Sequence, residues 1–205
     1  MASIRGEIGG EIQGTVGDVT VSTWKGMKVA KRKRGPSVKP VTEAQQARRD
    51  QFAFASDYAK EVAADAAKKG VYATLAKGQP TTWRALAVQD YLTPPIVARV
   101  DVQEYHGKVG DRMDLFIHDQ TVQSVHIRLV SPTAGQPAPE PGHEPLGTVV
   151  EEGAAERAVP GQDSHWIYHA TALLPGAKIF LVVKARDLPG NVGTTMLDGE
   201  VQVAQ

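Results

Sequence analysis

The chain has 205 residues, no cysteine, and as many acidic as basic side chains, so its formal net charge is zero. This length suits one large or two small domains. The lack of cysteine excludes disulfides, thiolate nucleophiles and cysteine-ligated zinc. No apolar run approaches the roughly 20 residues of a membrane-spanning helix. The N-terminus lacks the apolar segment of a signal peptide, so we expect synthesis in the cytoplasm; the sequence does not indicate the final compartment.

The charge is distributed unevenly along the chain. Residues 1–50 carry a net charge of +5, residues 51–95 of +1, and residues 96–205 of −6. A basic N-terminal region and an acidic C-terminal region can attract each other within one molecule or between neighbouring copies. The sequence leaves both possibilities open.

Residues 1–18 are rich in glycine and carry an apolar residue at every fourth position. These residues are Ile4, Ile8, Ile12 and Val16. A step of four places all of them on one face of an extended chain, and the glycines argue against a helix. We therefore expect an extended arm with a one-sided apolar ridge.

A β-hairpin is predicted next, over residues 19–24 and 27–33. Lys25 and Gly26 separate these two runs, and a two-residue connection with glycine second is typical of a tight hairpin. A two-stranded hairpin is at best marginally stable alone. We expect this one to pack on the rest of the chain or on another copy.

A basic connector, residues 31–40, follows the hairpin and holds five cations and two prolines. The prolines Pro36 and Pro40 favour an extended backbone before them. The connector could be a solvated linker, a contact to nucleic-acid phosphates, or a contact to an acidic protein surface.

The region from Gly14 to Phe52 resembles the N-terminal module of an uncharacterised bacterial protein family that is commonest in Bacteroidetes. The resemblance rests on Gly14-x-Val16-Gly17, Trp24-Lys25-Gly26, a basic segment with Pro40, Thr42-Glu43-Ala44-Gln45, Arg48 or Arg49, and Phe52. It implies a bacterial or phage-related source, and therefore the bacterial cytoplasm as the place of synthesis. It implies no known activity, so no functional residue is carried over.

Two helices are predicted over residues 42–95. Thr42 and Gln45 form a capping box that opens a helix over residues 42–69, with Gly70 at its C-terminus. Its apolar stripe comprises Phe52, Ala55, Ala59, Val62 and Ala66. A second helix over residues 82–92 begins after Thr81 and ends before Pro94-Pro95, which makes a helical hairpin.

Short strands separated by turns are predicted from residue 96 onward. They span residues 96–102, 112–117, 122–130, 148–152, 166–171, 178–186, 192–196 and 199–203. This pattern is typical of an antiparallel β-sandwich. The run 179–185 followed by Asp187-Leu-Pro-Gly-Asn191 resembles the penultimate hairpin of bacterial immunoglobulin-like or fibronectin-type-III-like modules. Residues 132–145, with five prolines, are predicted to be an exposed mobile loop.

The expected fold is therefore α+β in three parts. Residues 1–41 form the glycine-rich arm, hairpin and connector, residues 42–95 the helical hairpin, and residues 96–205 an immunoglobulin-like β-sandwich.

No catalytic motif is present, so we expect no enzyme activity, no cofactor and no metal. His165 and His169 have the spacing of a helical zinc pair. On the predicted strand, however, they would lie about 13 Å apart, too far to share one metal. Asp119, Asp187 and Asn191 could supply oxygen ligands to calcium, but a turn role is the favoured interpretation.

Three functional hypotheses remain. The favoured one is a structural protein that self-assembles into a filament or ring, with the arm and hairpin docking on a neighbouring copy, for which a sandwich edge is a natural place. The second is a nucleic-acid-binding protein that uses the basic hairpin. The third is an adhesion or carbohydrate-binding module, for which Trp166 and Tyr168 should be exposed. The self-association residues would be Ile4, Ile8, Ile12, Val16, Val19, Val21, Trp24, Met27 and Val29, and the basic patch would be Lys28, Lys31, Arg32, Lys33, Arg34 and Lys39.

Overall fold

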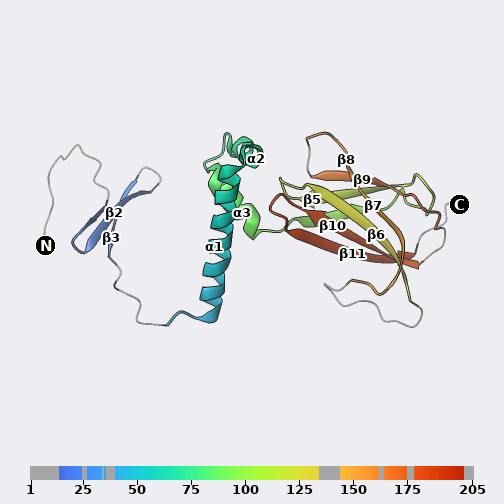
Figure 1. Ribbon diagram of the computed structural model, residues 1–205, viewed down its shortest axis with the longest axis horizontal. Helices are drawn as coiled ribbons and strands as arrows, with labels where there is room; N and C mark the ends of the chain where they lie inside the picture. Colours follow the sequence, from blue (N-terminus) through green and yellow to red (C-terminus); the bar gives the residue numbers. More distant parts are fainter. Residues whose placement is uncertain are drawn as a thin grey trace. The chain divides into compact units, whose positions relative to one another are not determined.

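The computed structural model describes residues 14–24, 27–33, 35, 40–133, 144–161, 164–174 and 178–200. Over these residues the protein is α+β, with three helices and three antiparallel sheets (Figure 1). The chain divides into two compact units, Met1–Gln46 and Ala47–Gln205. Within the described ranges, no helix has the length and apolar composition needed to cross a membrane.

The N-terminal sheet contains β1 (Gly14–Val16), β2 (Val19–Trp24) and β3 (Met27–Arg32), in the order β1-β2-β3. The predicted hairpin is confirmed, because β2 and β3 pair from Val19 opposite Arg32 to Trp24 opposite Met27. The strand β1 was not predicted as a pairing strand. It turns into β2 through Gly17, whose φ of +57° suits glycine. The sequence signal for this turn was the pair Gly17-Asp18 between two β-prone runs.

The first helix, α1 (Glu43–Ala64), begins at the predicted capping box. The backbone N–H of Gln45 donates to Thr42 Oγ1 at 3.3 Å, and the N–H of Thr42 donates to Gln45 Oε1 at 3.3 Å. These two reciprocal bonds satisfy backbone donors that a helix start leaves without partners.

The predicted single helix over residues 42–69 is wrong, because α1 ends before Asp65 and α2 (Ala66–Ala76) begins after it. Asp65 has a non-helical backbone (φ −102°, ψ 108°), and its carboxylate accepts the N–H groups of Ala67 and Lys68 at 2.9 and 3.1 Å. An aspartate at this cap position favours a new helix over continuation of the old one. Gly70 consequently lies inside α2, not at a helix end.

The third helix, α3 (Trp83–Leu92), is capped by Thr82 rather than Thr81; its Oγ1 accepts the N–H of Ala85 at 3.2 Å. The helices enclose a buried cluster of Tyr58, Ala59, Val62, Tyr72 and Ala87.

The N-terminal half of α1 extends beyond the other two helices (Figure 1). With 22 residues against 11 and 10, α1 is about 33 Å long and α2 and α3 about 15–17 Å each. Phe52, predicted in the buried stripe, is therefore 58% exposed.

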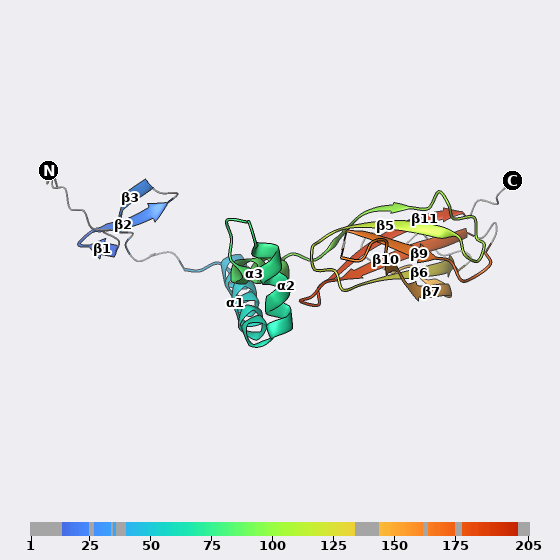
Figure 2. The ribbon, with the colours of Figure 1, turned by 90° about the horizontal axis from the view of Figure 1, so that it is seen from above.

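The C-terminal region contains two four-stranded antiparallel sheets (Figure 2). One has the order β11-β10-β6-β7 and the other β4-β5-β9-β8. The strands are β4 (Ile96–Asp101), β5 (Arg112–His118), β6 (Ser124–Pro132), β7 (Gly147–Ala154), β8 (Glu156–Arg157), β9 (His165–His169), β10 (Lys178–Arg186) and β11 (Val192–Glu200). The two strands predicted over residues 192–196 and 199–203 are one strand, β11, as far as the structure describes them, and the short β8 was not predicted.

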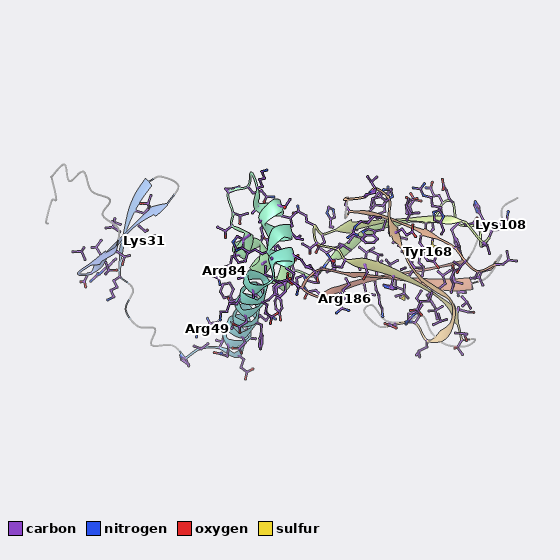
Figure 3. The ribbon with its side chains drawn as sticks, turned by 45° about the horizontal axis from the view of Figure 1, so that its top comes forward. Lys31, Arg49, Arg84, Lys108, Tyr168 and Arg186 are labelled. Atoms are coloured by element: carbon purple, nitrogen blue, oxygen red, sulfur yellow. The ribbon has the colours of Figure 1, made fainter. Side chains whose placement is uncertain are left out.

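The two sheets share one hydrophobic core. Alternate side chains of β5 and β10 point into it, among them Met113, Leu115, Leu181 and Val183. Figure 3 shows Tyr168 between the two sheets. The chain passes from one sheet to the other at Ala155, which connects β7 to β8. The sheets also approach each other where the backbone of Gly193, in β11, lies against the carbonyl group of Pro95, the residue before β4.

The predicted proline-rich loop is only partly described. Pro132 belongs to β6, Pro145 is half-buried, and residues 134–143 lie outside the described residues. Next to Pro145, the carboxylate of Glu144 pairs with Arg128 and Lys184 on β6 and β10. The Glu144 side chain is nevertheless 53% exposed, and the expectation of an exposed, mobile loop stays a prediction.

Candidate functional site

The most unusual polar arrangement lies where the helices meet the loops of the C-terminal sheets. Tyr58 of α1 and Tyr72 of α2 share a hydrogen bond of 3.0 Å between their hydroxyls. The Tyr72 hydroxyl donates to Asp90 of α3 at 2.5 Å. Thr121, from the loop between β5 and β6, donates its hydroxyl to the same carboxylate at 2.9–3.0 Å. Asp90 therefore links the helices to the sheets.

Two further loop aspartates surround Asp90. The Asp119 carboxylate accepts the N–H of Thr121 at 2.6 Å. The Asp187 carboxylate accepts the N–H groups of Gly190 and Asn191 at 2.8 and 2.6 Å, which is the turn role that the sequence favoured.

Asn191 connects this turn to the helices. Its side-chain amide donates to Asp187 Oδ2 at 2.8 Å and to the backbone carbonyls of Asp90 and Tyr91 at 3.1 and 3.2 Å. The Asn191 amide therefore bonds both to its own turn, at Asp187, and to the C-terminal end of α3.

We call Asp90, Asp119 and Asp187 the acidic junction, because one carboxylate oxygen of each lies within 4.8 Å of the others. Burial, and then the neighbouring carboxylates of Asp119 and Asp187, raise the pKa of Asp90 to about 6, against the hydrogen bonds from Tyr72 and Thr121. Burial also raises the pKa of Asp187. Burial and the bond to Asp90 raise the pKa of Tyr72 well above its ordinary value, so its hydroxyl remains a donor.

The acidic junction can hold a proton near neutral pH, and its oxygen atoms are of the type that bind a hard divalent cation. The sequence brought together Asp119, Asp187 and Asn191 but missed Asp90. No local signal could have identified Asp90, because its partners lie far away in the sequence. A cavity of 380 Å³ adjoins the junction, lined by Tyr72, Asp90, Asp119 and Thr121 together with more exposed residues such as His118.

A second buried polar cluster lies inside the C-terminal region, around Glu151 of β7. Its Oε1 accepts from the Tyr168 hydroxyl at 2.8 Å and from the N–H and hydroxyl of Thr171 at 2.5 and 3.0 Å. Burial and this carboxylate raise the pKa values of Tyr105 and Tyr168 to about 12. These hydrogen bonds connect β7 of one sheet to Tyr168 of β9 in the other sheet and to Thr171, which follows β9.

The outer face of β4, β5 and β9 carries a row of planar side chains. The Arg99 guanidinium lies 4.3 Å from the Phe116 ring centre, and this ring stacks on His165 at 4.6 Å. His165 Nε2 lies 2.5 Å from Asp114 Oδ1, and Arg112 pairs with the same carboxylate at 2.6 Å. These bonds lower the pKa of Asp114, with the Arg112 bond as the largest cause.

The histidine and aromatic candidates can now be placed. His165 and His169 both lie on β9, as expected from the strand pattern. Trp166 and Tyr168 are each only 3% exposed, so they do not form the exposed aromatic surface that the carbohydrate-binding hypothesis required.

The predicted self-association residues lie on the N-terminal sheet where the structure describes them. Val16 is 71% and Val19 42% exposed, and Val21 and Val29 are half-buried. Trp24 and Met27 belong to β2 and β3. Ile4, Ile8 and Ile12 lie outside the described residues.

Of the predicted basic patch, Lys28 belongs to β3, and Lys31, Arg32 and Lys33 are exposed. Arg34 and Lys39 lie outside the described residues. The strand register places Lys31 opposite Thr20 and Arg32 opposite Val19, so these two cations are on opposite faces of the sheet.

Comparison with known proteins gives no family for this chain: no family model matches it, and no curated protein matches it.

Proposed function

We propose that this chain is a non-enzymatic structural protein whose copies assemble by docking the N-terminal sheet of one copy on the next. We further propose that the two C-terminal sheets form an immunoglobulin-like sandwich, which serves as the body of each subunit. The family resemblance of residues 14–52 agrees with this proposal but adds no activity to it.

The observation that carries the proposal is an uncovered apolar face on the N-terminal sheet. The register places Val16 opposite Val19, and Val21 opposite both Gly14 and Ala30, so that Val16, Val19, Val21 and Ala30 share one face, with the cation Arg32 beside Val19 at one end of it. We call it the valine face. None of the described side chains of β1–β3 is buried.

A small sheet without a covered apolar face is not expected to be stable in water. Full burial of a valine side chain contributes about 1.5–3 kcal/mol, and association costs at least about 4 kcal/mol in lost freedom of motion. Val16 is 71% and Val19 42% exposed and Val21 is half-buried, so the three together have the exposed surface of only about one and a half valines left to bury, which contributes about 2–4 kcal/mol. Most of the binding free energy must therefore come from other parts of the subunit. A contact that does not close would generate filaments, whereas one that closes would give a ring.

The test replaces side chains on one face of β2 at a time. Val19→Lys with Val21→Lys places two charges on the valine face and should convert the assembly to monomer. The matched variant, Thr20→Lys with Ser22→Lys, changes the opposite face of the same strand, on which the register places Val29. Assembly should survive this second change if the valine face is the docking face, and its loss would instead assign docking to the face of Val29. Sedimentation velocity at tens of micromolar measures the outcome, and circular dichroism checks the fold.

Two results would contradict the proposal. One is a full-length protein that sediments as a monomer at these concentrations, and the other is a valine-face variant that assembles like the original. Salt near 0.5 M, at which the screening length is only a few ångströms, should weaken the assembly without abolishing it.

Nucleic-acid binding is the second candidate, because Lys31, Arg32 and Lys33 are exposed and have no ion-pair partner within the described part of the chain. Binding of this kind would be non-specific and would fall steeply with salt. Titration of duplex DNA at two salt concentrations tests it; lack of binding at low salt would eliminate it.

A further inference from the structure

A groove of 330 Å³ lies beside α1, α3 and the loop between β10 and β11, all within the unit Ala47–Gln205. Its walls contain Phe54 and Tyr58 from α1 and Tyr91 from α3, with Leu188 and Pro189 from the loop. The rings of Tyr58 and Tyr91 lie 5.4 Å apart at an angle of 33°. Phe54 is 61% exposed at the edge of the groove. Five of the eight lining residues are thus aromatic or apolar, although polar atoms make up the larger part of the exposed lining surface.

The polar part of the groove is acidic. Asp57 and Glu61, one helical turn apart on α1, line it, and Lys68 is the single cation among its lining residues. Burial, and then the negative charges of Asp90, Asp187 and Glu61, raise the pKa of Tyr58 at the base of the groove.

The one ion pair at the groove edge is a weak one. Lys60 binds Asp57 at 2.7 Å, but both side chains are more than 60% exposed. Surface pairs of this kind contribute only about 0–1 kcal/mol, so a basic ligand can replace Lys60.

We propose that this groove binds the basic connector, residues 31–40, of a second copy of the chain. The inference rests on the proposed self-assembly and names the surface that receives part of the neighbour. The connector has the chemistry that the groove lacks: five cations to meet Asp57 and Glu61, and Pro36 and Pro40 to lie on aromatic rings. Extended proline-containing segments bind aromatic-lined grooves because little conformational freedom is lost on binding.

The geometry of the chain permits this contact. Lys31 and Arg32 belong to β3, so the part of the connector beyond the sheet, residues 33–40, can span at most about 26 Å. This length allows it to cross the groove while the N-terminal sheet remains attached to it. Figure 3 shows the Lys31 side chain on the N-terminal sheet, and Arg32 and Lys33 are also exposed. These cations are therefore available to another molecule.

A charge exchange tests the proposal in the full-length protein. The groove variant carries Asp57→Lys and Glu61→Lys, and the connector variant carries Lys33→Glu, Arg34→Glu and Lys39→Glu, all of which lie outside β3 and therefore leave the valine face unchanged. Each variant alone should associate about tenfold more weakly or worse, as expected from the loss of several exposed charge pairs. An equimolar mixture should recover association, because every contact in an alternating assembly again joins opposite charges.

A matched pair of phenylalanine variants tests the apolar part of the groove. Phe54→Ser should weaken association, whereas Phe52→Ser should not, although the two side chains are 61% and 58% exposed on the same helix. Only Phe54 lines the groove. Circular dichroism of every variant checks that the fold is retained.

The outcomes separate this inference from the proposed function. A wild-type chain that remains monomeric would contradict both. If the wild type assembles but the groove variant assembles equally well, or the mixture fails to recover, the groove inference alone is overturned. Loss of duplex-DNA binding in a connector variant that still assembles normally would also overturn it, and would assign the connector to nucleic acid.

Discussion

The acidic junction makes a sharp prediction about pH. Asp90 has a folded pKa of about 6 against an ordinary value of 3.8. A raised pKa means that the folded state favours the protonated carboxyl. The associated stability is therefore complete below pH 3.8 and is lost as the pH rises through 6. A shift of about two units corresponds to about 3 kcal/mol in total, of which roughly half is lost between pH 5 and pH 8.

The substitution Asp90→Asn removes this titration while keeping an oxygen that can accept from Tyr72. The new amide can also donate to Asp119 or Asp187, which face it from the sheet loops. The variant should therefore gain stability over the wild type as the pH rises, by roughly 1 kcal/mol from pH 5 to pH 8. In urea unfolding, the midpoint of the variant minus that of the wild type should therefore be larger at pH 8 than at pH 5, by about 0.5–1 M.

The control is Asp111→Asn. The Asp111 carboxylate accepts the N–H groups of His106 and Lys108 at 2.7 and 2.9 Å, and these bonds lower its pKa. Its stabilising effect is present above its ordinary pKa and is lost only as the pH falls through the lower folded value. This variant should be less stable than the wild type by the same amount at pH 5 and pH 8. If the advantage of Asp90→Asn does not grow with pH, the account of the junction is wrong.

Three substitutions test the backbone and the helix ends, each by thermal or urea unfolding. Gly193→Ala should destabilise the protein by about 1–3 kcal/mol or more, because the added Cβ would lie 1.7 Å from the Pro95 carbonyl oxygen; an unchanged midpoint would show that this contact relaxes freely. Gly70→Ala, in α2 with nothing within 4 Å of the added Cβ, should instead stabilise by about 1 kcal/mol. Asp65→Ala should cost about 0.5–2 kcal/mol through loss of the α2 cap, and no loss would argue for one continuous helix.

Signals that are local in sequence predicted local structure well. The hairpin signal and the capping box at Thr42 both act within a few residues. The pairing of β2 with β3 and the reciprocal bonds of the capping box are confirmed, whereas the turn residues Lys25 and Gly26 lie outside the described residues. The strand β10 was predicted with its observed bounds, because a long β-prone run precedes the Asp187 turn.

The break at Asp65 was missed because the apolar stripe of α1 continues in register through Ala66. A cap is a local signal, but here a longer helical pattern obscured it. Phe52 was placed in the core for a related reason. Periodicity identifies the face of a helix that packs, but it does not show how far along the helix the partners reach.

The sequence did not predict that Asp90, Asp119 and Asp187 would lie together in one site. Asp119 and Asp187 were recognised as turn residues, but Asp90, in the last turn of α3, gave no indication that it would be buried. Burial of a single carboxylate depends on which distant loops arrive beside it. The self-association and basic residues on β2 and β3 are placed by the structure, and their roles remain predictions.

The hydrogen bonds around Asp90 also order the events of folding. The Tyr58–Tyr72 and Tyr72–Asp90 bonds join residues 14 and 18 positions apart, whereas the Asn191 side chain reaches the Asp90 carbonyl from 101 positions away. Contacts between residues that are distant in sequence form slowly, because the entropy cost of closing a long loop precedes any stabilisation from the contact. We therefore expect the helices to assemble first and the Asp90 carboxylate to take up its proton only when the turn before β11 packs against it. In a stopped-flow experiment near pH 6, proton uptake should accompany the last folding phase and should be absent from the first.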